Sequence, residues 1–256
     1  MKDKFQKLKI FFDSYTAEFD LEKEKDQKNI QLKIDHSQRV TKDMSEITAG
    51  MQLGLEEKYL AKIIALYHDI GRFKQYRQYK TFSDYKSEDH GELGVELIKE
   101  NKLIDDLSQN EQNIILKAIG QHNKADLNQK IFNNEREVFF ARLIRDADKL
   151  DIFNIFVERY KTKSQKDYII KLSAKAEINE EIYNKVLKKE SINYDKLETI
   201  ADLKAMQMGW IYDINFKETI EIIKARKYIK IIYNSMEQNQ QAEEIYKQLI
   251  KHLNSY

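Results

Sequence analysis

The chain has 256 residues, of which 41% are apolar and 34% charged, and its 44 basic and 43 acidic residues leave a formal net charge of +1. This balance argues against a nucleic-acid partner, which would favour a basic excess. The absence of cysteine excludes disulfides, cysteine-ligated zinc and a thiol nucleophile. The N-terminus lacks the apolar run of a signal peptide, and no segment has the roughly 18 apolar residues of a membrane span, so we expect a cytoplasmic protein with no membrane partner.

Helical periodicity dominates the N-terminal part of the chain. Apolar residues recur at three- and four-residue steps from Phe5 to Phe19, which predicts a first helix. A second helix is predicted over residues 29–49 and a third over residues 55–69. Gly71 is expected to end the third helix, because glycine readily adopts the left-handed conformation of a helix cap.

The segment 72–87 is rich in Tyr, Lys, Asp and Ser and has no clear period, which predicts a loop. A short helix then begins near His90, and another is predicted to end at His122. A long helix is expected from residue 135 to about residue 160, because apolar side chains recur along it with a helical period.

The predicted fold class is therefore all-α, with no β-strand expected. Residues 1–160 are predicted to form a helical core whose motifs lie within residues 29–160. Residues 161–256 are predicted to be a C-terminal helical extension packed on that core. These C-terminal helices are expected to form either a wall of the functional pocket or the surface of a homo-oligomer.

Four of the five histidines fall at inward-facing positions or helix ends: His36, His68, His90 and His122. A single histidine of this kind is usually a satisfied core or surface residue. Four in succession, each near a different predicted helix, are harder to explain that way. Imidazole combined with carboxylate suits Mn, Fe, Co, Ni or Zn, and carboxylate combined with water also suits Mg.

Two aspartates complete this set. Asp69 follows His68 directly, and because neighbouring residues on a helix diverge by about 100°, both reach one site only where the helix ends or the site is broad. Asp148 lies on an inward stripe between two isoleucines, where a carboxylate is costly unless a cation or a partner satisfies it. The alternative for Asp148 is a surface salt bridge, a role for which Asp146 and Asp151 on other faces are better candidates.

The order of His36, His68-Asp69 and Asp148 resembles the signature of the HD superfamily of metal-dependent phosphohydrolases, in which His, His-Asp and Asp follow one another on a helical core. The local sequence ALYHDIGRF matches the central motif of that family closely. The resemblance covers roughly residues 29–160. Within this range the chain is similar to HD proteins of the HDIGRF type. It implies an enzyme on a helical core that binds metal.

Two further segments, SEDHGELG with His90 and AIGQHNK with His122, look like the extra histidines of the binuclear HD proteins. The resemblance then implies two divalent metal ions (Mn, Fe, Mg, Co, Ni or Zn) that are bridged by Asp69. The implied metal ligands are His36, His68, Asp69, His90, His122 and Asp148. The glycine-rich loop of the HD-GYP cyclic-dinucleotide phosphodiesterases does not follow His122, which argues against that subclass.

Two cations bridged by a carboxylate lower the pKa of a water molecule bound to them and hold the resulting hydroxide for in-line attack. Cationic side chains nearby neutralise the charge that develops on a phosphoryl group during its transfer. The predicted catalytic residues are Asp69, Arg39 and Arg72. The predicted substrate-binding residues are Arg39, Arg72, Lys74 and Arg145. The expected partner is a small phosphorylated substrate, for instance a nucleotide.

Three functions agree with this residue set. The first is hydrolysis of a nucleotide or another small phosphate ester or anhydride. The second is that of a di-iron HD-type oxygenase, which uses the same ligands. The third is a non-catalytic HD ligand-sensing module, which predicts a loss of ligands that is not observed in this sequence. Aromatic residues between positions 73 and 85 could stack on a nucleobase, or they could form an ordinary packed loop.

Overall fold

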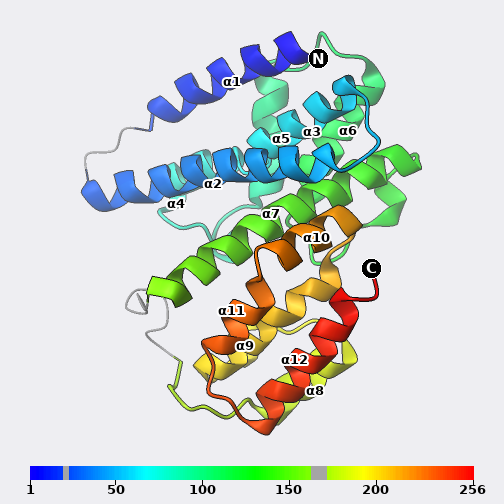
Figure 1. The fold of residues 1–256 in the computed structure, drawn as a ribbon. Helices are drawn as coiled ribbons and strands as arrows, with labels where there is room; N and C mark the ends of the chain where they lie inside the picture. Colours follow the sequence, from blue (N-terminus) through cyan, green and yellow to red (C-terminus); the bar gives the residue numbers. More distant parts are fainter. Residues whose placement is uncertain (20–22, 163–171) are drawn as a thin grey trace. The chain divides into compact units, whose positions relative to one another are not determined.

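The structure, a computed structural model, describes residues 1–19, 23–162 and 172–256 (Figure 1). The chain divides into two compact units, residues 1–151 and residues 152–256. Within the described ranges the regular elements are helices, and β-structure is limited to one isolated bridge between Ser173 and Thr199. The all-α prediction is confirmed. A separate core of residues 1–160 with an extension of residues 161–256 stays a prediction.

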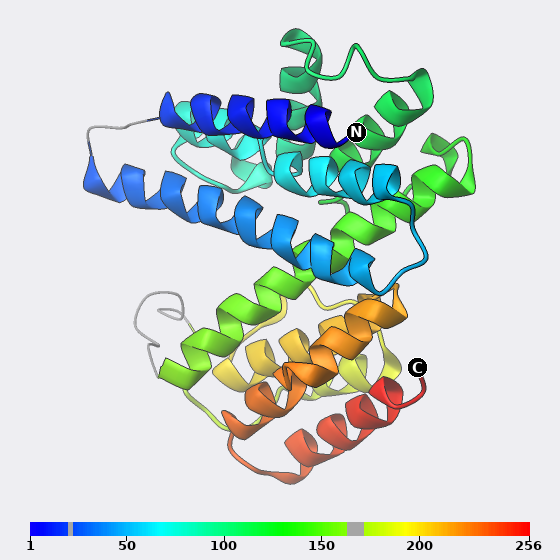
Figure 2. The ribbon, with the colours of Figure 1, turned by 45° about the horizontal axis from the view of Figure 1, so that its top comes forward.

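The first unit is built around one central helix. Its helices are α1 (Lys2–Ala17), α2 (Glu24–Ala49), α3 (Leu55–Tyr67), α4 (Gly71–Tyr79), α5 (His90–Glu100), α6 (Gln109–Gln121) and the first part of α7 (Glu135–Thr162). Short 3-10 turns lie at Asp84–Lys86 (η1) and Gln129–Ile131 (η2). Helix α3 packs against α1, α2 and α6, and Figure 2 shows α1 and α2 on either side of it.

This central position explains the burial of the second half of α3, in which every residue from Leu60 to Tyr67 except Lys62 is buried. Leu60, Ile64 and Tyr67 are fully buried, and the Tyr67 hydroxyl donates to the Leu8 carbonyl oxygen of α1 at 2.8 Å. Burial of one such large apolar side chain contributes about 1.5–3 kcal/mol to folding. The core that α3 forms with its neighbours therefore fixes the position of His68, the residue that follows the helix.

The predicted loop over residues 72–87 is wrong for its first half, because Gly71–Tyr79 form α4. Phe73 and Tyr76 lie three residues apart and are both buried, which is a helical spacing. The period is concealed in the sequence because a polar residue, Gln75, is also fully buried on this helix.

Gly71 also has a different role from the predicted cap. None of the glycines in the described residues has a positive φ, and Gly71 begins α4 instead of ending α3. A Cβ at this position would lie 2.1 Å from the His90 carbonyl oxygen and 2.6 Å from the Gly94 amide nitrogen. Glycine is therefore required here because α4 and α5 approach each other closely.

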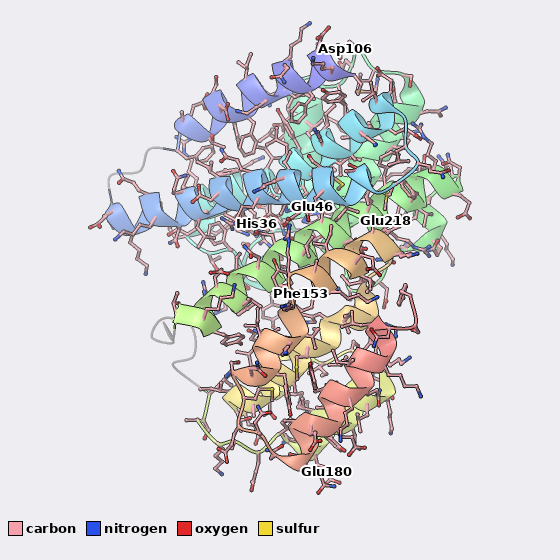
Figure 3. The ribbon with its side chains drawn as sticks, in the orientation of Figure 1. His36, Glu46, Asp106, Phe153, Glu180 and Glu218 are labelled. Atoms are coloured by element: carbon pink, nitrogen blue, oxygen red, sulfur yellow. The ribbon has the colours of Figure 1, made fainter. Side chains whose placement is uncertain are left out.

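The second unit contains the end of α7 and the helices α8 (Glu180–Lys188), α9 (Ile200–Gly209), α10 (Lys217–Ala225), α11 (Tyr228–Asn234) and α12 (Gln240–Leu253), with 3-10 turns at Tyr194–Lys196 (η3) and Trp210–Asp213 (η4). Helix α9 packs against α8, α11 and α12. On α7, Phe153 (labelled in Figure 3) packs edge-on against Trp210, with ring centroids 5.8 Å apart.

Among the described helices, none combines the length and apolar character needed to cross a bilayer.

Candidate metal centre

Two of the four histidines are positioned by the ends of helices. His68 directly follows α3 and His122 directly follows α6. The Nδ1 of His68 lies 2.8 Å from the Ala65 carbonyl oxygen, and the Nδ1 of His122 lies 2.7 Å from that of Ile119. A carbonyl oxygen only accepts, so both Nδ1 atoms carry the proton. This satisfies carbonyls that are left free at a helix end and leaves each Nε2 as a lone-pair donor.

The other two histidines are oriented by carboxylates. His36 lies within α2, on the side that faces α7 (Figure 3), and its Nδ1 lies 2.7 Å from the Asp151 Oδ2. His90 is the first residue of α5, and its Nδ1 lies 2.7 Å from the Asp84 Oδ2. An imidazole that donates Nδ1–H to a carboxylate has a fixed tautomer and a more basic Nε2, which is the usual arrangement of a metal-binding histidine.

The Nε2 atoms of His36 and His68 converge with two carboxylates. They lie 3.2 Å from each other, and the His36 Nε2 lies 3.1 Å from the Asp148 Oδ1 and 3.5 Å from the Asp69 Oδ2. Ligand atoms bound at about 2.1 Å to one cation are separated by about 3.0–3.4 Å in octahedral or tetrahedral geometry. The distances from the His36 Nε2 are close to this range, whereas the His68 Nε2 lies farther from the Asp148 Oδ1 and the Asp69 Oδ2, at 3.8 and 3.9 Å.

A second group lies on the other side of Asp69. The Asp69 Oδ1 is 3.2 Å from the His90 Nε2 and 3.6 Å from the His122 Nε2, and these two nitrogens are 3.0 Å apart. Among the residues that the structure describes, two groups could hold an ion: His36 with His68 and Asp69, and Asp69 with His90 and His122. One carboxylate therefore faces both groups, with one oxygen directed to each.

The charge states differ between the histidines. Burial lowers the pKa of His68 to about 3, so its ring is neutral near pH 7. Burial opposes the charged form of His36 as well, but hydrogen bonds with Asp148 and Asp151 outweigh it and raise the pKa of His36 to about 9. In the metal-free protein, His36 is therefore an imidazolium between two carboxylates.

Two cationic side chains stabilise the charge of Asp69. The Lys33 Nζ lies 2.8 Å from the Asp69 Oδ2, and the Arg72 Nε lies 3.4 Å from the Oδ1. Burial opposes ionisation, yet the charges of Lys33 and, to a smaller extent, Arg72 hold the pKa of Asp69 well below its usual value. Lys33 was not predicted from the sequence, although it precedes His36 by three residues and therefore shares its helix face.

The other predicted cations interact mainly with protein oxygens. Arg39 donates through Nε and Nη2 to Asp151, at 2.6 and 3.0 Å. Arg145 donates to the carbonyl oxygens of His122, Lys124 and Ala125, the residues that follow α6. Lys74 pairs with Glu96 of α5 at 3.9 Å. Substrate binding by Arg39, Lys74 and Arg145 stays a prediction.

Asp151 was a candidate for a surface salt bridge. It does form an ion pair, with Arg39, but the surface position is wrong because its side chain is fully buried between His36 and Arg39. Asp146, the other candidate for that role, is also fully buried. Hydrophobic periodicity alone could not assign them, because α7 is covered on several sides in this region: Leu143, Ile144, Ala147 and Leu150 are all fully buried.

Asp84, in the turn η1, is a third residue of the candidate centre that the sequence did not reveal. Its Oδ2 accepts from His90 at 2.7 Å and from the Asn123 side chain at 3.1 Å. Its Oδ1 accepts from the Arg72 Nη1 and the Gln75 Nε2, both at 2.8 Å. These partners come from separate segments of the chain, so no local spacing could have indicated them.

The aromatic segment after Arg72 is mostly packed. Phe73 lies in the core against Phe12, with ring centroids 5.9 Å apart. Tyr76 stacks on Phe82 at 4.7 Å, and Phe82 in turn lies 5.4 Å from the Lys33 Nζ. Tyr85, by contrast, is 98% exposed. Tyr79 is 41% exposed, so the alternative of a packed segment describes Phe73, Tyr76 and Phe82 but not Tyr79 and Tyr85.

The HD domain family matches residues 34–152, a segment that contains all six predicted ligands. Neither the curated proteins nor the solved structures gave a match to the chain. HD domains are typically metal-dependent hydrolases, and the buried His/Asp cluster described above is able to bind metal. Assignment to the HDIGRF type stays a prediction. The match over residues 34–152 supports an HD-superfamily assignment for this part of the chain.

Proposed function

We propose that this centre binds two divalent cations and hydrolyses a phosphate ester or anhydride bond of a small phosphorylated substrate such as a nucleotide. The observation that supports this most directly is that the two oxygens of the Asp69 carboxylate face different pairs of histidines. Its Oδ2 faces the histidines at positions 36 and 68, and its Oδ1 faces those at positions 90 and 122. A carboxylate placed in this way suits a bridge between two cations.

In this proposal the first cation is held by His36, His68, Asp148 and the Oδ2 of Asp69. The second is held by His90, His122 and the Oδ1 of Asp69. Bound divalent cations supply Lewis acidity and an activated water near neutral pH. The carboxylates of Asp84 and Asp151 keep the Nδ1 atoms of His90 and His36 protonated, so that both Nε2 atoms stay available as ligands.

The substrate is proposed to enter beside Asp148, whose side chain is 23% exposed whereas those of the other five ligands are almost fully buried. Lys33 and Arg72 flank the bridging carboxylate and are each about 15% exposed. They are therefore the cations best placed to contact a phosphoryl group that approaches the centre. In phosphoryl transfer such groups act by positioning the substrate and neutralising its charge.

The test is a hydrolysis screen of the metal-free protein reloaded with Mn, Mg, Co or Fe. Nucleoside phosphates, cyclic nucleotides and simple phosphodiesters are offered with and without dioxygen. We expect metal-dependent release of phosphate or of a phosphomonoester that does not require dioxygen. Asp69→Ala should abolish turnover, whereas Asp105→Ala, which alters an exposed aspartate in the same unit, should leave it unchanged.

Two results would contradict the proposal. Full activity of Asp69→Ala would show that the reaction takes place elsewhere. Turnover that requires iron and dioxygen would show that the same six side chains serve an oxygenase, the alternative that the ligand set alone leaves open.

A further inference from the structure

The C-terminal unit contains two hollows that meet at one residue, Lys189. The larger is a groove of about 540 Å³ along α12, lined among others by Lys189, Lys247, Gln248, Lys251 and His252. The smaller, of about 120 Å³, is lined among others by Lys189, Trp210 and Tyr212 and by two acidic residues, Glu190 and Asp213. Small-molecule sites in proteins typically have volumes of roughly 300–1,000 Å³, so the two hollows together are of suitable size.

The larger groove has an excess of positive charge. Its lining has three lysines and one carboxylate, that of Glu244, which accepts from the Tyr183 hydroxyl at 2.6 Å and keeps its charge. Lys247 is paired with Glu243 at 2.6 Å. Among the residues that the structure describes, Lys189 and Lys251 have no carboxylate within ion-pair distance. Unpaired charges of one sign in a concave surface attract a ligand of the opposite sign.

The groove also contains an unsatisfied polar atom. The Nε2 of His252 is buried and has no hydrogen-bond partner in the described part of the chain. Buried polar atoms are nearly always hydrogen-bonded in folded proteins, so the His252 Nε2 has a hydrogen-bonding capacity that the described residues leave unused. This observation is independent of the charge of the two lysines.

The wall between the hollows is aromatic and held in place. The Tyr212 ring lies 5.3 Å from the Lys189 Nζ and 4.8 Å from the His252 ring. Gln248 donates to the Tyr212 hydroxyl at 3.1 Å and to the Leu187 carbonyl oxygen at 2.6 Å, which ties α12 to the end of α8. Trp210 and Tyr212 thus present aromatic rings to the smaller hollow, and such rings bind flat heterocycles by stacking.

We propose that these hollows form one binding site for a ring-bearing phosphate of the nucleotide class, separate from the metal centre. The ring occupies the smaller hollow against Trp210 and Tyr212. The phosphates occupy the groove, where Lys189 and Lys251 provide the charge. Lys189 lines both hollows, so it would lie where the ring and the phosphates of the ligand are joined.

The sequence provides a local reporter for this site, because Trp210 is the only tryptophan in the chain. The full chain, kept metal-free with EDTA, is titrated with ATP while tryptophan fluorescence is recorded, and binding is checked by equilibrium dialysis. We expect a saturable change with ATP and much weaker binding of inorganic triphosphate, which has no ring. Lys189→Ala and Lys251→Ala should each weaken ATP binding by at least about tenfold, since each removes a charge-assisted contact.

Lys188→Ala is the matched control, because Lys188 is the exposed last residue of α8 and is not part of either lining. It should bind ATP as the unaltered protein does, and circular dichroism verifies that all three variants are folded. Three results would each overturn the proposal: no saturable binding of ATP at millimolar concentration by either method, full affinity in folded Lys189→Ala or Lys251→Ala, or binding of triphosphate as tight as that of ATP.

Discussion

The histidines of the candidate centre are oriented by hydrogen bonds that they donate away from it. His68 and His122 donate to backbone carbonyls, whereas His36 and His90 donate to the carboxylates of Asp151 and Asp84. The backbone acceptors cannot be removed by substitution, but the carboxylates can. The contribution of orientation to metal binding is therefore open to test at Asp84 and Asp151.

Asp84→Asn should weaken metal binding at the group that contains His90. The amide keeps the shape of the side chain but loses the negative charge that makes the imidazole a better donor, and such changes reduce metal affinity by about 10–100-fold. Calorimetric titration of the metal-free protein with Mn measures the effect. Asp105→Ala serves as the control, and an affinity for Asp84→Asn equal to that of the unaltered protein would refute a role for Asp84 in orienting His90.

Metal binding should release protons below pH 9. The pKa of His36 is raised to about 9 by Asp148 and Asp151, so a cation that binds its Nε2 at pH 7 must displace a proton. Calorimetry in buffers of different ionisation enthalpy should therefore detect about one proton more at pH 7 than at pH 9.5. The same number of protons at both values would show that His36 does not bind the cation.

The pKa of His36 also has a consequence for the stability of the metal-free protein. A histidine whose pKa is higher in the folded than in the unfolded state stabilises the fold fully below the unfolded value of about 6.5. This stabilisation is lost as the pH rises from there through about 9. The free energy of unfolding in EDTA, measured by urea titration, should therefore fall over this interval, and a rise across it would contradict the assigned pairing.

At the level of helices, the contact between α4 and α5 depends on Gly71. A Cβ there would lie 2.1 Å from the His90 carbonyl oxygen. This oxygen belongs to the backbone, which cannot move away from the clash as the end of a flexible side chain could. Gly71→Ala should therefore destabilise the protein by about 1–3 kcal/mol or more and weaken metal binding, because α5 begins with His90. Gly54→Ala, where a Cβ would have no neighbour within 4 Å, is the control for a glycine substitution without a clash.

The predicted helices and the observed ones differ where polar residues are buried. Helices with a clear apolar period, such as α3, were predictable from the sequence because their burial follows from the period itself. Helix α4 was predicted as loop because Gln75 is buried for its hydrogen bonds with Asp84 and Ser87 and not for hydrophobicity. The cap expected at Gly71 was wrong because helix packing, and not a left-handed turn, requires glycine there.

The six predicted ligands are brought together in the structure, whereas three of their partners could not be found from the sequence. The ligands lie at helix ends or on inward faces, and both kinds of position can be recognised locally. Lys33, Asp84 and Asp151 obtain their roles from contacts between distant segments. Such contacts depend on tertiary packing, which one sequence without an alignment does not reveal.

Over the whole molecule, metal removal should lower stability. The six proposed ligands come from α2, α5 and α7 and from the residues that follow α3 and α6, so cations held by them connect most of the first unit. A ligand that binds only the folded state at 100 times its Kd adds about 2.7 kcal/mol to the free energy of unfolding. EDTA should therefore lower the Tm, and restored Mn should raise it again. An unchanged Tm would indicate that the fold does not depend on the centre.

The central claim is a centre that binds two metal ions bridged by the Asp69 carboxylate. The number of ions bound per chain tests this claim most directly. Elemental analysis after dialysis against Mn, with the protein concentration measured independently, should give two ions per chain. His90→Ala should retain one, because the group formed by His36, His68, Asp69 and Asp148 stays complete. Asp69→Ala should lose both. One ion per chain in the unaltered protein, or two in folded Asp69→Ala, would contradict the account.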